Sequence, residues 1–306
     1  MTNEAVRSVR ALPAKARVRP AQAGPIGVIV LGLVAAWYLA AMVMNAAGVR
    51  DQFERDESAY TTAELIAGTL SAERPVLPAP HQIVAELANS VLSYPPNSNR
   101  SLIYHGWVTL SATLAGFVMG GLLGIALAVL IIYVRTLEKS LLPWIISSQT
   151  IPILAIAPIV IVVLGSIGIR GLLPKSIISA YLCFFPITIG MVKGLNSPDP
   201  LQRDLMRTYS ASAPQTFFKL RWPSSMPFLF TSLKVAIAAS LVGAIVGELP
   251  TGAQAGLGAR LLAGSYYGQT VQIWAALLAA AILAAALVAA IGAAERLVLR
   301  RMGGAP

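Results

Sequence analysis

Six long apolar stretches constrain this chain more than any other feature. A helix needs about 20 mostly apolar residues to cross a bilayer, and only 12% of the 306 residues are charged, about half the usual share in a soluble domain. The sequence therefore predicts an all-α integral membrane protein with six transmembrane helices. They are expected at 25–49, 107–134, 142–165, 176–192, 228–246 and 271–292, the fourth being the weakest.

The basic residues indicate how these spans are oriented. With a cytoplasmic N-terminus, 15 of the 23 Lys and Arg residues fall on the cytoplasmic side and 7 outside, while Lys234 lies within the fifth span. The positive-inside rule therefore favours an N-in, C-in arrangement. Topology also explains the net charge of +10, so we expect no nucleic-acid partner. The long stem of Lys234 is expected to carry its charge to the lipid interface.

The spans divide the chain into regions. Residues 1–24 form a basic cytoplasmic tail, and 25–49 form the first transmembrane helix, which is too long for the core of a signal peptide. Residues 50–105 form an extracytoplasmic segment with short amphipathic helices, either packed as a surface loop or contacting a substrate-carrying protein. Residues 106–301 form a core domain with five transmembrane helices and a cytoplasmic loop at 195–226.

That loop is expected to hold two short helices. Asp199 before Pro200 is typical of a helix start, so one helix should run from Pro200 to about Tyr209. The second should begin near Pro214, after a turn of small residues, and end by about residue 222 because Pro223 disfavours helical geometry before it. Its apolar surface indicates either an interaction site or a face resting on the membrane helices and lipid.

The stretch "SASAPQTFFKLRWP" completes a pattern that resembles the cytoplasmic loop of permease subunits of ATP-binding-cassette importers. In those loops an acidic residue, a glycine and a proline keep fixed spacing, and Asp204, Ser210 and Pro223 occupy these positions. Serine fits the turn at negative φ, whereas a left-handed backbone would strain it. The segments "QTIPILAIAPIVIVVLG", "FFPITIGMVKGLNSPDP" and "GLGARL" resemble the branch that imports nitrate, sulfonates, taurine, bicarbonate and pyrimidine-type precursors.

The resemblance covers about 107–301 and implies a type I importer fold in the bacterial inner (plasma) membrane. Two permease copies, by default a homodimer, would form a path for a small polar solute delivered by an extracytoplasmic binding protein. The solute would be a pyrimidine-type nitrogen compound or an anion like sulfonate, taurine or nitrate. Two copies of a cytoplasmic ATPase subunit would dock on the loops, whose coupling residues would be Asp204, Tyr209, Ser210, Ala211, Ser212, Ala213, Pro214, Phe217, Phe218 and Pro223.

We expect no catalytic residue, metal site or cofactor on this chain. It contains no G-x-x-x-x-G-K-[ST] phosphate loop, so ATP and Mg²⁺ would bind the partner ATPase. His81 and His105 are far apart in sequence and do not suggest a metal site or a catalytic pair.

Several polar and proline residues near or within the spans are candidates for lining the translocation path, although a structural kink or hydration at the interface would explain them equally well. They are Gln149, Thr150, Pro152, Pro158 and Glu248. Gly116, Gly120 and Gly124 share one face of the second span and predict close helix packing.

Two other functional classes stay open at this point. An ion-coupled secondary transporter usually places ionisable residues at mid-membrane within inverted repeats, and the spans here are nearly free of acids. A non-transporting membrane scaffold would use the same loop to recruit a soluble partner.

Overall fold

The computed structural model describes residues 20–250 and 255–302, and every regular element in these ranges is a helix. Of the basic tail expected at 1–24, residues 1–19 lie outside the described ranges. In chain order the helices are α1 (Pro20–Arg55), α2 (Thr62–Ser71), α3 (Pro80–Leu92), α4 (Leu102–Tyr133), α5 (Arg135–Ser148), α6 (Ile153–Ser166), α7 (Leu172–Leu195), α8 (Pro200–Thr208), α9 (Ala213–Thr216), the π-helical turn η1 (Phe217–Arg221), α10 (Trp222–Glu248), α11 (Leu257–Tyr266) and α12 (Thr270–Arg301).

Within the described residues, five helical segments are each long and apolar enough to cross a membrane: α1, α4, α7, the continuous α9–η1–α10 segment, and α12. The fourth predicted span, the shortest in the sequence, belongs to α7, which has 24 residues and continues through Pro186. Neighbouring helices tolerate such a proline because they can satisfy the carbonyl it leaves free.

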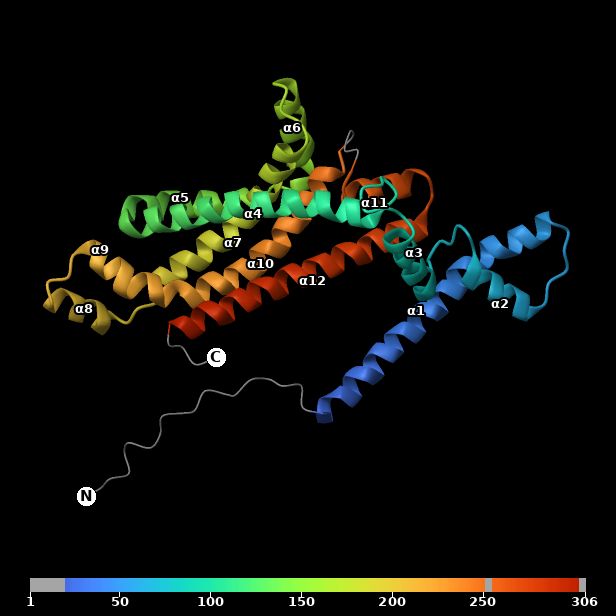
Figure 1. Ribbon diagram of the computed structural model, residues 1–306, viewed down its shortest axis with the longest axis horizontal. Coiled ribbons are helices and arrows are strands. Elements are labelled where there is room, and N and C mark those ends of the chain that lie inside the picture. The colour runs from blue at the N-terminus through green and yellow to red at the C-terminus, as the bar shows by residue number, and fades with distance from the viewer. Residues whose placement is uncertain (1–19, 251–254, 303–306) are drawn as a thin grey trace, which may run out of the picture.

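The third predicted span, 142–165, is not one continuous helix. It is divided between α5 and α6, which meet at an angle of 95°. Pro152 lacks an N–H and disfavours helical geometry at Ile151, so α5 ends at Ser148 and the chain turns before α6 begins. In Figure 1, α5 lies along α4 whereas α6 projects from the bundle. Only if this bent pair is counted as one span do the described residues contain six.

Helices α4, α7 and α10 form the centre of the bundle (Figure 1). The glycines of α4 face α7 so closely that a Cβ on Gly120 would lie 2.4 Å from Cys183 Sγ, and one on Gly116 would lie 2.4 Å from Ser179 Cβ. Small residues permit such an approach where lipid supplies no hydrophobic drive for helix association. The close packing predicted from their spacing is therefore present within this chain.

Buried hydroxyl groups join the same three helices. The Ser179 and Ser240 Oγ atoms lie 2.6 Å apart, and the Ser240 hydroxyl donates to the Thr113 carbonyl at 2.8 Å. All three residues are less than 1% exposed. These bonds satisfy polar groups that would be costly to leave unpaired in an apolar bundle.

An ion pair joins α10 to α12. Lys234, expected from sequence to extend to the lipid interface, pairs with Glu295 near the end of α12. That its charge reaches the lipid interface stays a prediction. Two opposite charges paired in a partly buried site are less costly than either charge left alone.

Helix α1 is joined to the bundle through its second half and the segment that follows it. The Asn45 side chain donates to the carbonyls of Thr69 and Leu77 at 3.0 and 2.9 Å, while the ring of Trp37 lies 5.1 Å from that of Trp274. The first half of α1 stands apart from the other helices (Figure 1). Helices α2 and α3 lie in the segment for which short amphipathic helices were expected.

Candidate functional site

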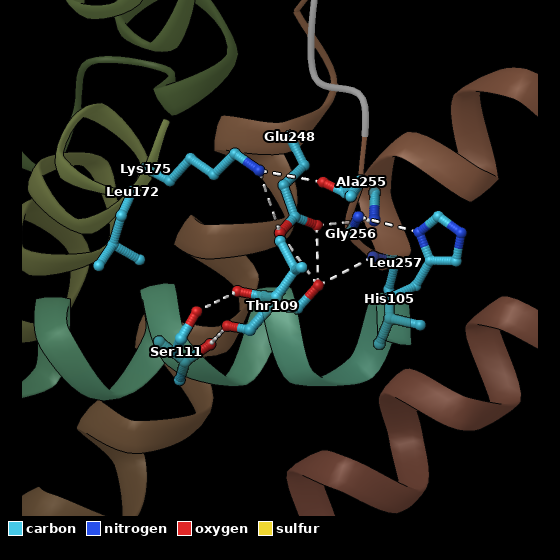
Figure 2. Close-up of polar contacts among 12 residues, drawn as sticks. His105, Thr109, Ser111, Leu172, Lys175, Glu248, Ala255, Gly256 and Leu257 are labelled. Carbon is cyan, nitrogen blue, oxygen red and sulfur yellow. Dashed lines mark hydrogen bonds and ion pairs between the residues drawn. The ribbon is translucent and has the colours of Figure 1, made fainter. Parts of the chain in front are cut away.

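Two groups of residues at opposite ends of α10 are candidate functional sites. The first is the α8–α9 loop, which we define as residues 196–221 and which lies at one end of the bundle in Figure 1. The second is the Glu248 cluster, defined as His105, Thr109, Lys175, Glu248 and the backbone of 255–258 (Figure 2).

The first helix of the loop begins as its sequence predicts. The Asp199 carboxylate accepts a hydrogen bond from the Leu201 N–H at 2.8 Å, and the Gln202 side chain accepts from the Asp199 N–H at 3.3 Å. This reciprocal cap satisfies two N–H groups that a helix start leaves free. Together with Pro200 in the first turn, it fixes where α8 begins.

Ser210 forms the turn after α8 in a left-handed conformation, with φ of 51°. Its N–H donates to the Arg207 carbonyl at 2.8 Å, and the Ala211 N–H donates to the Met206 carbonyl at 2.9 Å. This pair of bonds is the Schellman ending of a helix, whose left-handed position usually holds glycine. Serine is therefore strained here, the outcome that the sequence associated with a left-handed turn.

The second helix of the loop does not end near Trp222, as its sequence had suggested. Ser212 caps the start of α9, and the chain then continues through η1 directly into α10. Pro223 does not break the helix, because it lies in the first turn of α10, directly after the wider π-helical turn. The loop and the membrane span that follows it are therefore joined by a continuous helix.

The two phenylalanines of the loop point to different surroundings. Phe217 packs against the hydrophobic core, with its ring 6.0 Å from Tyr133 and 5.8 Å from Trp222. Phe218 is 67% exposed. Phe217 therefore rests on the membrane helices of its own chain, whereas Phe218 faces outward. That the outward face is an interaction site stays a prediction.

The outward surface of the loop combines apolar and basic side chains. Leu201, Leu205 and Tyr209 are 80%, 55% and 77% exposed, more apolar surface than a short solvated loop ordinarily carries. A cleft of about 530 Å³ opens beside them, with arginines among its lining residues. Asp204, at the acidic position of the pattern, forms an exposed ion pair with Arg207 at 3.2 Å.

At the other end of α10, the Glu248 side chain is fully buried. Figure 2 shows its carboxylate between α4 and the backbone that leads into α11. The Thr109 hydroxyl lies 3.0 and 2.9 Å from the two carboxylate oxygens, the Gly258 N–H donates at 2.9 Å, and Lys175 Nζ lies 3.8 Å away. The hydration that the sequence left open for this residue is excluded by its burial.

The neighbouring backbone is fitted closely around this carboxylate. Gly256 has φ of 126°, and a Cβ there would lie 2.1 Å from Glu248 Cδ, so only glycine fits. The Gly256 N–H donates to His105 Nδ1 at 3.0 Å, and the Leu257 N–H donates to the Thr109 hydroxyl at 2.8 Å. His105 Nε2 lies 2.9 Å from the Asn99 carbonyl, which assigns the ring proton to Nε2.

The other path candidates lie in the bent pair of helices and not in this cluster. Gln149, Thr150 and Pro152 occupy the turn between α5 and α6, and Pro158 lies inside α6 without breaking it. The Thr150 hydroxyl donates to the Ser147 carbonyl at 2.7 Å. Their role in lining a path stays a prediction.

Sequence reasoning missed most members of the Glu248 cluster. Thr109 and Glu248 are 139 positions apart, and Lys175 had been placed only among the basic residues of an outer loop. The one available signal was the pair of glycines in "GLG", eight and ten residues after Glu248, because glycines at such spacing indicate close approach of a backbone.

No group of three or more potential metal-binding side chains occurs among the described residues.

Closely packed apolar helices, with a helical loop at one end and a buried polar cluster at the other, define a multi-pass membrane protein. Residues 120–304 match the family described as the binding-protein-dependent transport system inner membrane component, and the chain belongs to this family. It is a transport permease subunit located in the inner membrane, as the resemblance in its sequence had predicted.

Related permeases are named for different small solutes. The formylaminopyrimidine transport permease protein ThiX of Halalkalibacterium halodurans is 33% identical over 184 residues, which cover 60% of this chain and 68% of the relative. The riboflavin transport system permease protein RibX of Chloroflexus aurantiacus is 30% identical, covering 74% and 80%. The putative aliphatic sulfonates transport permease protein SsuC of Bacillus subtilis is 23% identical, covering 78% and 82%.

Proposed function

We propose that this chain is the membrane-spanning subunit of an ATP-driven importer and that the α8–α9 loop docks on a separate ATPase subunit. Two copies of the chain form a path for a small polar solute, a pyrimidine-type compound or an anion like sulfonate, taurine or nitrate, which a binding protein delivers. ATP and Mg²⁺ bind the ATPase subunits, one of which contacts each loop. The termini lie in the cytoplasm, and the residues of the α5–α6 turn, with Pro158, line the path.

The observation that carries the proposal is that two neighbouring phenylalanines of the loop have opposite surroundings. Phe217 anchors the loop to the bundle, whereas Phe218 presents an apolar ring outward. Because η1 continues into α10 without a break, a force on the loop acts directly on a membrane helix. Such a connection suits rigid-body switching between two packed states.

The test is co-purification of the chain from its native membrane in mild detergent, with its partners identified by mass spectrometry. Phe218→Asp is expected to lose the ATPase subunit because it places a charge on the docking surface, while the permease itself still elutes as one monodisperse size-exclusion peak. Tyr267→Asp is the matched control, since Tyr267 is 72% exposed and follows α11 at the opposite end of the bundle (Figure 1).

An ATPase subunit retained by Phe218→Asp would exclude this residue from the docking surface. Absence of an ATPase from the wild type and from both variants would overturn the proposal and favour a scaffold or a secondary transporter. An importer also requires ATP, so uptake that survives ATP depletion but stops with an ionophore would contradict it independently.

A further inference from the structure

A cavity lies next to the Glu248 cluster, between the first part of α4, the end of α6, the start of α7 and the end of α10. Its volume is about 680 Å³, within the range of small-molecule sites. Tyr104, Ser111, Arg170 and Lys175 are among its lining residues, with apolar side chains such as Ile161 of α6. A few polar groups on an apolar wall are typical of a pocket that orients a ligand.

Lys175 belongs both to this cavity and to the Glu248 cluster. Its Nζ atom donates to the Ala255 carbonyl at 3.0 Å and lies 3.8 Å from Glu248 Oε1, with 13% of the side chain exposed. An ammonium group has three donors, and the contact with the carboxylate is longer than a charge-assisted hydrogen bond. Lys175 therefore keeps donor capacity for a ligand in the cavity.

Glu248 does not depend on Lys175 for its hydrogen bonds. Thr109 and the Gly258 N–H already donate to its carboxylate from the side of α4 and α11. The carboxylate is fully buried and is not among the residues that line the cavity. Its charge offsets that of Lys175 without blocking the ammonium from the cavity side.

Arg170 supplies the second cation of the cavity. It is exposed, and no carboxylate from the described part of the chain lies within 4.0 Å of it. A guanidinium presents several donors in one plane and matches the two oxygens of a carboxylate, sulfonate or nitrate group. Arg170 and Lys175 together with one satisfied carboxylate give the cavity a positive balance, which concentrates anions.

We propose that this cavity is a binding site for the anionic group of the transported solute, an oxyanion such as a sulfonate or carboxylate held between Arg170 and Lys175. The inference rests on the proposed function and narrows its solute class to anions, against the neutral pyrimidine-type compounds. The site lies at the end of the bundle opposite the α8–α9 loop, where a binding protein would deliver the solute.

The test measures binding of methanesulfonate to the full chain in phosphatidylcholine nanodiscs, by saturation-transfer NMR on the methyl protons. Dimethyl sulfone is the neutral comparison because it has nearly the same shape without the charge. The wild type is expected to bind methanesulfonate, and Arg170→Gln to raise its Kd at least about tenfold, the size of effect expected from losing one charge-assisted hydrogen bond. Dimethyl sulfone should bind neither protein measurably.

Matched variants separate the site from general surface charge and from folding. Arg100→Gln removes an exposed arginine that does not line the cavity, so its Kd should equal that of the wild type. Lys175→Arg should keep binding because the charge is retained, whereas Lys175→Gln should weaken it. Arg170→Gln is the decisive variant. The wild-type Arg170 side chain is exposed and makes no hydrogen bond to the described residues, so its loss leaves the Glu248 cluster intact.

Three outcomes would overturn the proposal. Equal binding of methanesulfonate and dimethyl sulfone would show that charge is not recognised, and an unchanged Kd in Arg170→Gln would place the anion elsewhere. Loss of methanesulfonate binding when phosphatidylglycerol is added to the discs would assign the site to a lipid phosphate. None of these outcomes affects ATPase co-purification, so failure here is distinguishable from failure of the proposed function.

Discussion

At the scale of single residues, Glu248 shows how one carboxylate can join distant parts of a membrane protein. It accepts from Thr109 of α4 and from the Gly258 N–H in the first turn of α11, and it faces Lys175 of α7. A carboxylate only accepts hydrogen bonds, so a single buried group can serve donors from several elements at once. Such a group is costly to disturb because each donor it releases stays buried.

Glu248→Gln tests this role with little change in volume. In the wild type, each carboxylate oxygen faces a hydrogen-bond donor. In the variant the amide NH₂ replaces one of these oxygens and meets a donor that it cannot accept from, so the variant should lose about 1–3 kcal/mol of stability. The midpoint of thermal unfolding in detergent would measure the loss, with the exposed Glu138→Gln as control. In a double-mutant cycle with Lys175→Met, the double variant should lose less stability than the sum of the losses in the two single variants. Strict additivity would show that Lys175 and Glu248 do not interact.

Ser210 offers the opposite case, a residue whose replacement should stabilise the protein locally. Its φ of 51° suits glycine, so Ser210→Gly should relieve about 1 kcal/mol of backbone strain. Hydrogen exchange of peptides across the turn should slow, because the two bonds that end α8 open less often. Ser210→Ala keeps the Cβ and should leave exchange unchanged, and faster exchange in Ser210→Gly would contradict the strain.

At the scale of helices, the contact between α4 and α7 depends on the absence of side chains. Gly120→Ala would place a Cβ 2.4 Å from Cys183 Sγ and 2.7 Å from the Ala180 carbonyl oxygen, a clash that should cost about 1–3 kcal/mol. Gly106→Ala lies on the same helix with nothing within 4 Å, so it should be neutral or slightly stabilising. Comparing the two thermal midpoints tests the packing, and equal midpoints would contradict it.

Elements whose signals are local could be predicted from the sequence. The Asp199 cap, the start of α9 and the glycine face of α4 each depend on residues a few positions apart, and the structure contains all three. The sequence marked Pro152 as a possible kink in span three but did not predict two separate helices. The direction of a chain after a proline turn depends on what the chain packs against, which the local sequence does not reveal.

Features that depend on distant partners could not be predicted. The burial of Glu248 requires Thr109, and the pairing of Lys234 requires Glu295, which lies 61 positions away. The end of the second loop helix was misplaced for a different, local reason. A proline is tolerated in the first turn of a helix, and the π-helical turn before Pro223 lets that helix start without a break in the chain.

At the scale of the whole molecule, α10 connects the two candidate sites. It joins the α8–α9 loop through η1 at one end and carries Glu248 at the other, across 27 residues. That length corresponds to about 40 Å at 1.5 Å per residue. A displacement of the loop therefore reaches the cavity beside Lys175 through one continuous helix. Because this helix is long enough to cross a membrane, the loop and the cavity are expected on opposite sides of it.

This arrangement predicts which positions are accessible from each side. Ser93→Cys should react with a membrane-impermeant maleimide in intact spheroplasts, whereas Ser212→Cys should react only after permeabilisation, because the positive-inside rule favours a cytoplasmic loop. The native Cys183 is buried, so it remains in place and the wild type should stay unlabelled throughout. The reverse pattern would invert the orientation, and it would remove the loop from the only compartment where an ATPase could reach it.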